Sequence, residues 1–230
     1  MKLLALDTSS VACTVALQHG DKIIERHEEQ PREHTRLLVP MIRSLLEEAR
    51  AEIRDLDAIV LGNGPGSFIG MRIAASVAQG LAFASGINII PVSSLAAVAA
   101  QVLEEHDATE VAVTQDAHMN EVYLGIYARD DEGFAKARIA ERLHVQEVIA
   151  ELSHSIDGRR FAAGSGWSRY PALLEHNRGW IDQVVDILHP RARYLLRLGS
   201  EAIEAGESIF PADVVPAYLR QKVAQKPAPP

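Results

Sequence analysis

The sequence predicts an α/β fold of two domains, each a mixed sheet with helices packed on it. Three observations support this prediction. The first half of the chain reads as three strands followed by alternating helices and strands, and a similar order begins again near Glu110. At 230 residues, the chain is also long enough for two hydrophobic cores. We therefore expect a first domain in residues 1–106 and a smaller second domain in residues 107–230, with a mobile tail from about residue 222.

Three short strands open the chain. Residues 2–6 and 11–17 are apolar runs, and residues 22–27 form a third candidate strand. Gly20 lies in the short segment between the last two runs, and glycine readily takes the positive φ of a tight hairpin turn. These features predict an antiparallel meander.

A helical period follows Pro31. Leu38, Ile42 and Leu45 fall on one stripe, and charged residues fall on the other side. Pro40 lacks the N–H that an interior helical residue donates, so this helix either starts late or bends there. An apolar strand is expected next, at residues 58–62.

The loop Gly64-Pro-Gly-Ser-Phe-Ile-Gly-Met-Arg72 leads into a helix, residues 73–84, that carries no ionisable side chain. Surface helices normally show charge on one side. At 100° per residue, the arc expected to face the sheet comprises Ile73, Ala74, Val77, Ala78, Leu81 and Ala84. Small or pliable side chains occupy the opposite side, which is either buried in the same domain or a docking surface for another helix. We favour docking, and the candidate partner-docking residues, two of them from the preceding helix, are Leu37, Met41, Met71, Ala75, Gln79 and Ala82.

A strand at residues 87–92 and an alanine-rich helix through Leu103 complete the first half, and Ser93 and Ser94 are expected to cap that helix. The strands expected in the second half are residues 111–115, 121–128, 135–143 and 160–163, and the helices are residues 145–152 and 192–205. Antiparallel strands followed by crossover units predict a mixed sheet in each half.

Composition limits the partners of the chain. The formal charge is −8 and the pI is near 5.6, so the chain lacks the positive surface with which proteins hold phosphate backbones. Any contact with RNA therefore needs a partner that supplies the positive charge.

Cysteine content and hydropathy exclude further classes of protein. Cys13 is the only cysteine, which excludes a disulfide framework or a thiolate metal cluster within one chain. Asp7 ends the N-terminal apolar run too early for a signal peptide, and no uninterrupted apolar run reaches the roughly 18 residues of a membrane span. We expect a cytoplasmic protein without membrane contact.

The order of elements resembles that of the actin, hexokinase and Hsp70 (ASKHA, RNase H-like) superfamily of phosphotransfer ATPases. Working members hold phosphate and magnesium with an Asp-x-Gly turn in each half, because glycine lets backbone N–H groups approach the anion. Here the two turns read Asp7-Thr-Ser9 and Asp116-Ala-His118, and both lack the glycine. The resemblance therefore implies a degenerate cleft, whose vestigial nucleotide or anion site would comprise Asp7, Ser9, Gly64, Gly66, Ser67 and Asp116.

The glycine loop itself matches neither the Walker P-loop nor the dinucleotide-binding pattern. Its glycines permit tight turns, and the start of the following helix presents unpaired N–H groups. The loop therefore either binds an anion or only shapes a turn.

No metal site and no catalytic site is predicted. His34 has Gln30 and Leu38 four residues away, so it lacks the second histidine that a helical metal site requires, and a hydrogen bond at the helix end is its expected role. Ser67 lies outside the Gly-x-Ser-x-Gly pattern of hydrolase nucleophiles. Asp116 and Glu121 remain as reserve acid–base candidates.

Five segments together resemble the bacterial TsaB family. They occur in the order found in that family, span nearly the whole chain, and depart from the usual pattern mainly at Ile69, where threonine is common. The segments are residues 7–9 (DTS), 34–42 (HTRLLVPMI), 64–72 (GPGSFIGMR), 116–123 (DAHMNEVY) and 216–220 (PAYLR).

This resemblance implies a non-catalytic scaffold subunit in the synthesis of N6-threonylcarbamoyladenosine (t6A), the modified adenosine 3′ of the anticodon in tRNAs that read codons beginning with A. In that family the related subunit TsaD binds metal and transfers the group, and the ATPase TsaE completes the assembly. The implied partners are TsaD, through helices of the first domain, TsaE, and a second copy of the chain when it is alone. Contact with tRNA is implied only through the complex. No cofactor is implied, and weak ATP or ADP binding at a subunit interface is left open.

Two other hypotheses remain. The chain is a working ATPase or kinase that uses Asp7 and Asp116, or it is a metallopeptidase, which the missing ligand pair disfavours. ATP turnover by the purified chain separates the first of these from the scaffold.

Overall fold

The computed structural model describes residues 1–220 of the chain. The strands of the first half are β1 (Lys2–Asp7), β2 (Ala12–His19), β3 (Lys22–Glu29), β4 (Ala58–Gly62) and β5 (Asn88–Val92). Its helices are α1 (His34–Ala49), α2 (Phe68–Ser85) and α3 (Ser94–Glu105).

The second half is richer in short elements. Its strands are β6 (Glu110–Asp116), β7 (Glu121–Arg129), β8 (Ala135–Ala137), β9 (Arg142–Val145), β10 (Arg160–Ala163) and β11 (Gln183–Val184). Its helices are α4 (Ser165–Arg169), α5 (Pro171–Asn177) and α6 (Ala192–Glu204).

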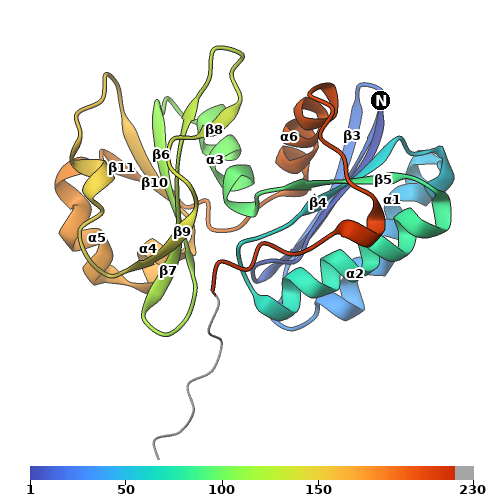
Figure 1. Cartoon of the computed structure of the whole chain (residues 1–230), viewed down its shortest axis with the longest axis horizontal. Helices are drawn as coiled ribbons and strands as arrows, with labels where there is room; N and C mark the ends of the chain where they lie inside the picture. The colour runs from blue at the N-terminus through green and yellow to red at the C-terminus, as the bar shows by residue number, and fades with distance from the viewer. Residues whose placement is uncertain (221–230) are drawn as a thin grey trace, which may run out of the picture.

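Two mixed sheets lie side by side (Figure 1). The strand order is β3-β2-β1-β4-β5 in the first and β11-β10-β6-β7-β8 in the second, with β9 also paired to β7. In both sheets an antiparallel meander is extended by two parallel strands. The predicted α/β fold with two related sheets is therefore confirmed, whereas the predicted mobile tail lies outside the described residues.

Helices α1 and α2 cover one face of the first sheet (Figure 1). Leu4 and Leu6 of β1 share a core there with Leu38 of α1. Helix α1 begins before Pro40 and runs through it, so the helix does not start late.

Helix α6 covers the opposite face of the first sheet, although it comes from the end of the chain. Leu195 and Leu196 share a core with Leu3 of β1. A Cβ atom at Gly199 would lie 2.5 Å from Cγ2 of Val60, so only glycine lets the helix lie this close to β4.

The helices α3 and α6 are exchanged relative to the predicted domains. Helix α3, from residues 1–106, packs on β6 and β7 of the second sheet, while α6, from residues 107–230, packs on β1 and β2 of the first. The two helices also contact each other, and one hydrophobic core extends through both to the two sheets. The strands of the first sheet precede residue 106 and those of the second sheet follow it, but one hydrophobic core includes residues from both sides of this position.

Because one core spans both sheets, we expect the protein to unfold in a single cooperative transition. Both tryptophans, Trp167 and Trp180, lie in the second half, so their fluorescence reports on the second sheet, whereas far-UV circular dichroism reports on both. The two signals should give the same midpoint in urea. Fluorescence that changes at a clearly different urea concentration from the circular dichroism would show that the sheets unfold independently.

The helix predicted at residues 145–152 is wrong. The segment begins with the last residue of β9, bends at residues 146 and 147, and continues into a short 3-10 turn, Ala150–Ser153. The side chain of Asn177 accepts a hydrogen bond from Ile149 N–H at 2.8 Å and donates one to Glu147 O at 3.0 Å. These tertiary bonds satisfy the backbone groups that a helix would otherwise pair.

The single strand predicted at residues 135–143 is divided into β8 and β9, which both pair with β7. Between them the chain turns so that Glu141 accepts hydrogen bonds from Ser93 and Tyr127. The helices α4 and α5 were not predicted, because segments of five and seven residues are too short to show a helical period.

By length and composition alone, α2 is apolar enough to cross a membrane, and it is the only such helix in residues 1–220. A third of its residues, 33%, are buried within the protein. Its apolar character is therefore divided between the core and the surface.

Candidate functional site

Asp7 is the carboxylate of the predicted nucleotide cleft, and it is fully buried at the end of β1. Ser94 Oγ donates to its Oδ2 at 2.5 Å, and Ser9 N–H donates to its Oδ1 at 2.6 Å. A Cβ atom at Gly62 would lie 2.0 Å from Oδ2. Burial raises the pKa of Asp7 to about 6, while the bonds from Ser94 and Ser9 lower it. Protein atoms of Ser9, Gly62 and Ser94 therefore surround this carboxylate.

Three contacts close the cleft over Asp7. The carbonyl oxygen of Ser9 accepts hydrogen bonds from Ser67 N–H at 2.6 Å and from Gln115 Nε2 of the second sheet at 2.9 Å. A Cβ atom at Gly66 would lie 2.2 Å from the same oxygen. The structure thus brings together five of the six predicted cleft residues, with Ser94 connecting Asp7 to Gly64; they are Asp7, Ser9, Gly64, Gly66 and Ser67.

The start of α2 is capped by the chain itself. Ser67 Oγ accepts a hydrogen bond from Gly70 N–H at 3.2 Å, so Ser67 is the N-cap. Thr8 Oγ1 donates to Gly70 O at 2.7 Å, and a Cβ atom at Gly70 would lie 1.9 Å from Thr8 O. This close packing favours the interpretation that the glycine loop shapes a turn rather than an anion site.

Asp116 lies at the end of β6 and has partners of its own. Tyr170 Oη and His118 N–H each donate to its Oδ1 at 2.8 Å, and Arg169 Nε lies 3.8 Å from its Oδ2. The turn that follows contains three consecutive residues with positive φ, His118, Met119 and Asn120. Asp116 therefore helps to hold this hairpin turn.

The burial of Asp7 predicts that stability depends on pH. Its pKa is about 6 in the folded protein against an ordinary value of 3.8, so between these values the folded state binds more protons than the unfolded state. Stability should therefore fall as pH rises through this window and stay lower above it. Asp7→Asn removes the buried charge, and should stabilise the protein near neutral pH by about 1 to 3 kcal/mol.

Urea unfolding of both proteins at about pH 5 and about pH 7.5 measures this effect. The difference in stability between the two proteins should be larger at the higher pH. Equal pH dependence in the two proteins would show that Asp7 does not titrate in this range.

The reserve acid–base candidates and His34 have structural partners. Glu121 pairs with Arg220 at 2.6 Å. His34 begins α1, and its Nε2 donates to Ser10 O at 3.0 Å, which confirms the hydrogen-bonding role predicted for it. Burial lowers the pKa of His34, while this bond raises it. Residues 1–220 contain no group of three or more His, Cys, Asp or Glu side chains that could hold a metal ion.

The docking residues predicted on α2 were assigned to the wrong side of the helix. Met71, Ala75 and Ala82 are buried, with exposed fractions of 3, 5 and 0%. Ala75 and Ala82 belong to the core that α2 shares with the first sheet. Gln79 is partly buried and donates to Pro211 O at 2.8 Å. The alanines let the helix lie close to the sheet. The larger side chains that were expected to face the sheet, those of Ile73, Val77 and Leu81, are only partly buried at the edge of this core.

The two docking residues predicted on α1 also belong mainly to the core. Met41 is buried, and Leu37 is partly buried and packs on the same cluster. Neither therefore offers a large contact area in this structure.

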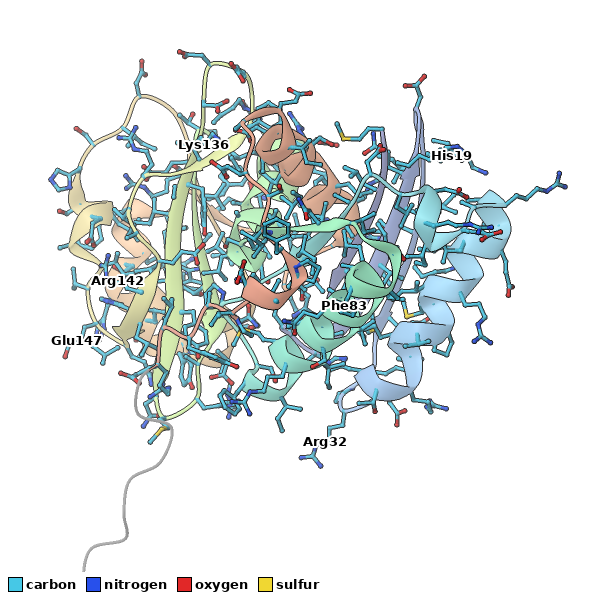
Figure 2. All side chains as sticks on the ribbon, turned by 45° about the vertical axis from the view of Figure 1, so that its right-hand side comes forward. His19, Arg32, Phe83, Lys136, Arg142 and Glu147 are labelled. Carbon is cyan, nitrogen blue, oxygen red and sulfur yellow. The ribbon has the colours of Figure 1, made fainter. Side chains whose placement is uncertain are left out.

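The solvent-exposed side of α2 is nearly uncharged. Ile69 is 71% exposed and Phe83, labelled in Figure 2, is 81% exposed. Arg72, at one end, is the only ionisable residue of the helix. We refer to this side as the outer face of α2, which comprises Ile69, Arg72, Ile73, Ser76, Val77, Gly80, Phe83 and Ala84. A shallow hollow in it is lined by Ile69, Arg72, Ile73, Ser76 and Val77.

Arg72 is held in place by two aromatic rings. Its guanidinium carbon lies 3.7 Å from the centroid of the Phe68 ring, and its Nε donates to Tyr218 Oη at 3.0 Å. The Phe68 and Tyr218 rings are 5.4 Å apart.

The C-terminal segment that contributes Tyr218, residues 205–220, crosses α2 and reaches the second sheet (Figure 1). Asn63 accepts a hydrogen bond from Ala217 N–H and donates one to Val215 O, both at 3.0 Å. Arg220 then pairs with Glu121 of β7. Sequence reasoning noted residues 216–220 as a motif but did not predict that they connect the two sheets.

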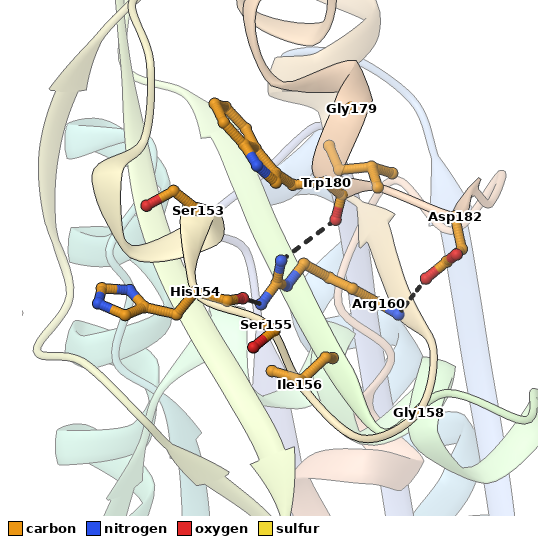
Figure 3. Close-up of a pocket in the computed structure, with 10 residues that line it drawn as sticks. Ser153, His154, Ser155, Ile156, Gly158, Arg160, Gly179, Trp180 and Asp182 are labelled. Atoms are coloured by element: carbon orange, nitrogen blue, oxygen red, sulfur yellow. Dashed lines mark hydrogen bonds between the residues drawn. The ribbon is translucent and has the colours of Figure 1, made fainter.

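A pocket of about 310 Å³ lies at the opposite end of the second sheet from Asp116 (Figure 3). The buried Arg160 forms part of its wall and pairs with the buried Glu110 at 2.5 Å. The guanidinium also donates to the carbonyl oxygens of Leu152, His154 and Trp180. Arg160 therefore connects the loops before β10 and β11, and sequence reasoning missed it because a buried ion pair leaves no local pattern.

Comparisons with known proteins agree with the observed fold. A family model described as TsaD, tRNA N6-adenosine threonylcarbamoyltransferase, matches residues 23–162. A protein of Escherichia coli named tRNA threonylcarbamoyladenosine biosynthesis protein TsaB is 33% identical over 100% of this chain and 99% of its own length. The protein of the same name from Haemophilus influenzae is 34% identical, with coverage of 100% and 98%. The solved structure of YeaZ from Pseudomonas aeruginosa is 38% identical, with a TM-score of 0.87 over 95% of this chain and 99% of that one.

Proposed function

This chain belongs to the TsaB proteins, within the wider family whose model describes TsaD, and from that membership we propose that it is a non-catalytic scaffold subunit of the t6A synthase. It takes part in the biosynthesis of threonylcarbamoyladenosine in tRNA. In our proposal the catalytic subunit TsaD transfers the threonylcarbamoyl group to N6 of the adenosine 3′ of the anticodon, and this chain supports TsaD together with the ATPase TsaE in the cytoplasm.

The outer face of α2 is the observation that carries this proposal. Exposed apolar surface is unfavourable in water at about 25 cal/mol per Å², so an uncharged helix face is typical of a surface that is covered in an assembly. A standard protein interface buries on the order of 1,600 Å² in total, which sets the scale of the contact that we propose. We propose that TsaD docks here, and that a second copy of the chain docks here when TsaD is absent.

The closed cleft supports a role without catalysis. Asp7 is surrounded by Ser9, Gly62 and Ser94, and its cleft is closed by Gln115 and the glycine loop. Phosphate transfer needs an open site in which these groups meet a nucleotide. The formal charge of −8 also favours a protein that meets tRNA only through its partners.

Reconstitution tests the proposal. The TsaD and TsaE proteins of the same organism, with their substrates and unmodified tRNA, should form t6A only when this chain is added. The chain alone should not hydrolyse ATP at a steady rate. Full modification without the chain would overturn the proposal, and so would steady ATP hydrolysis by the chain that Asp7→Asn abolishes.

A further inference from the structure

Arg72 is the one charged group on the outer face of α2, and it is fixed in a defined orientation. Its Nε is used by Tyr218, and its planar group lies over the Phe68 ring. The two Nη groups form no hydrogen bond or ion pair with any residue in the range 1–220. A guanidinium held in this way keeps its fork of N–H donors ready for a planar anion, and little side-chain entropy remains to be lost on binding.

The chemistry of the face limits what can cover Arg72. A protein surface that buries this charge without supplying an anion would leave it unpaired in a medium of low dielectric, which is strongly unfavourable. Helix α2 carries no carboxylate of its own. A symmetric contact of α2 with α2 from a second copy would therefore bring Arg72 no counter-ion from that helix.

We propose that Arg72 selects the partner by binding a carboxylate on the partner's docking surface, an otherwise apolar helix face in the TsaD-type subunit. The carboxylate lies at the Ile69 end of the outer face, where the hollow beside Arg72 accepts it. This inference rests on the proposed function, because it specifies the chemistry of the same interface.

Tyr218 is a positioning residue in this scheme. It belongs to the C-terminal segment, which is tied to the start of the glycine loop through Asn63. Because Tyr218 Oη accepts from Arg72 Nε, loss of the hydroxyl frees the guanidinium to rotate. Tyr218→Phe keeps the ring and should therefore weaken association less than loss of the charge does.

The test measures the affinity of the purified full-length chain for the TsaD protein of the same organism. Arg72→Met keeps an apolar stem over Phe68 and removes the charge, and should weaken binding by about thirty-fold or more. Arg72→Lys should recover part of the loss, since it restores the charge without the fork. Added salt should weaken binding of the natural chain more steeply than that of Arg72→Met. Arg178→Met, an exposed arginine of the second half, is the matched control and should bind like the natural chain.

The outcomes separate the inference from the proposed function. If Gly80→Glu abolishes binding to TsaD while Arg72→Met binds within about threefold of the natural chain, the carboxylate contact is wrong and the docking face stands. If neither substitution affects binding, both the carboxylate contact and the proposed docking face are wrong. An Arg72→Met protein that loses only self-association, with TsaD binding unchanged, also overturns the inference. Equal thermal stability of the variants and the natural chain confirms that binding, not folding, has changed.

Discussion

Replacing Gly80 with glutamate should abolish docking to TsaD without destabilising the chain. Gly80 lies at the centre of the outer face of α2, and a Cβ atom built there meets nothing within 4 Å. Glutamate is a better helix former than glycine by up to about 1 kcal/mol, so the isolated protein should be equally or more stable. In the complex, the added carboxylate would be buried against an apolar surface and left unpaired. We expect the affinity to fall on the order of a hundred-fold or more.

The matched control is Gly80→Ala, which makes the same change to the backbone without adding charge. It should bind TsaD nearly as well as the natural chain, and unfold at a similar or higher temperature. Isothermal titration calorimetry with TsaD measures binding, and a thermal melt measures stability. If Gly80→Glu binds TsaD as tightly as Gly80→Ala, this helix face is not the docking surface.

Replacing Arg160 with methionine should destabilise the second sheet strongly. The substitution leaves the Glu110 carboxylate buried without a counter-ion, and removes the donor to three loop carbonyls, those of Leu152, His154 and Trp180. Removing one member of a buried ion pair typically costs about 3 to 5 kcal/mol. Urea unfolding should therefore show a lower midpoint, with one transition retained because the two sheets share a core.

The control for this change is Arg142→Met. Arg142 pairs with Glu151 at 2.7 Å, and both side chains are 35% exposed, so its loss should cost no more than about 1 kcal/mol. The double variant with Glu110→Leu and Arg160→Met should be more stable than Arg160→Met alone, because no unpaired charge remains buried. If Arg160→Met and Arg142→Met lower the free energy of unfolding equally, the buried ion pair contributes no more to stability than the partly exposed one.

Much of the fold could be predicted from local pattern. The strands β1, β2 and β3, the strand–loop–helix unit around Gly64, and the helix capped by Ser93 all have clear periodicity and strong turn or cap residues. The repeated order of strands then predicted two related sheets. The helix predicted at residues 145–152 was wrong. Val145 and Val148, which suggested an apolar helix face, are exposed in the structure, and Asn177, distant in the sequence, binds the backbone of the segment.

The packing of the helices could not be predicted in the same way. Helix α2 is apolar on all sides, so hydrophobicity does not show which side faces the sheet. The structure places the alanine side inward, because small residues bring the helix close to β1 and β4, and it leaves Ile69 and Phe83 outside. The exchange of α3 and α6 between the sheets depends on contacts between distant parts of the chain, such as Gly199 against Val60.

The candidate site could likewise be predicted only in part from the sequence. The sequence identified Asp7 and the glycine loop as a cleft without the usual glycine turns, and the structure brings Asp7, Ser9 and Gly66 together. It could not reveal that Gln115 closes this cleft, or that Tyr218 orients Arg72, because each contact joins residues more than a hundred positions apart.

The most direct test of the account compares Asp7→Asn and Gly80→Glu in one assay, the formation of t6A in tRNA by TsaD and TsaE with each form of this chain. If the chain acts through its docking face and not through its cleft, Asp7→Asn should support modification like the natural chain and Gly80→Glu should not. Loss of modification with Asp7→Asn, together with full modification with Gly80→Glu, would contradict the account.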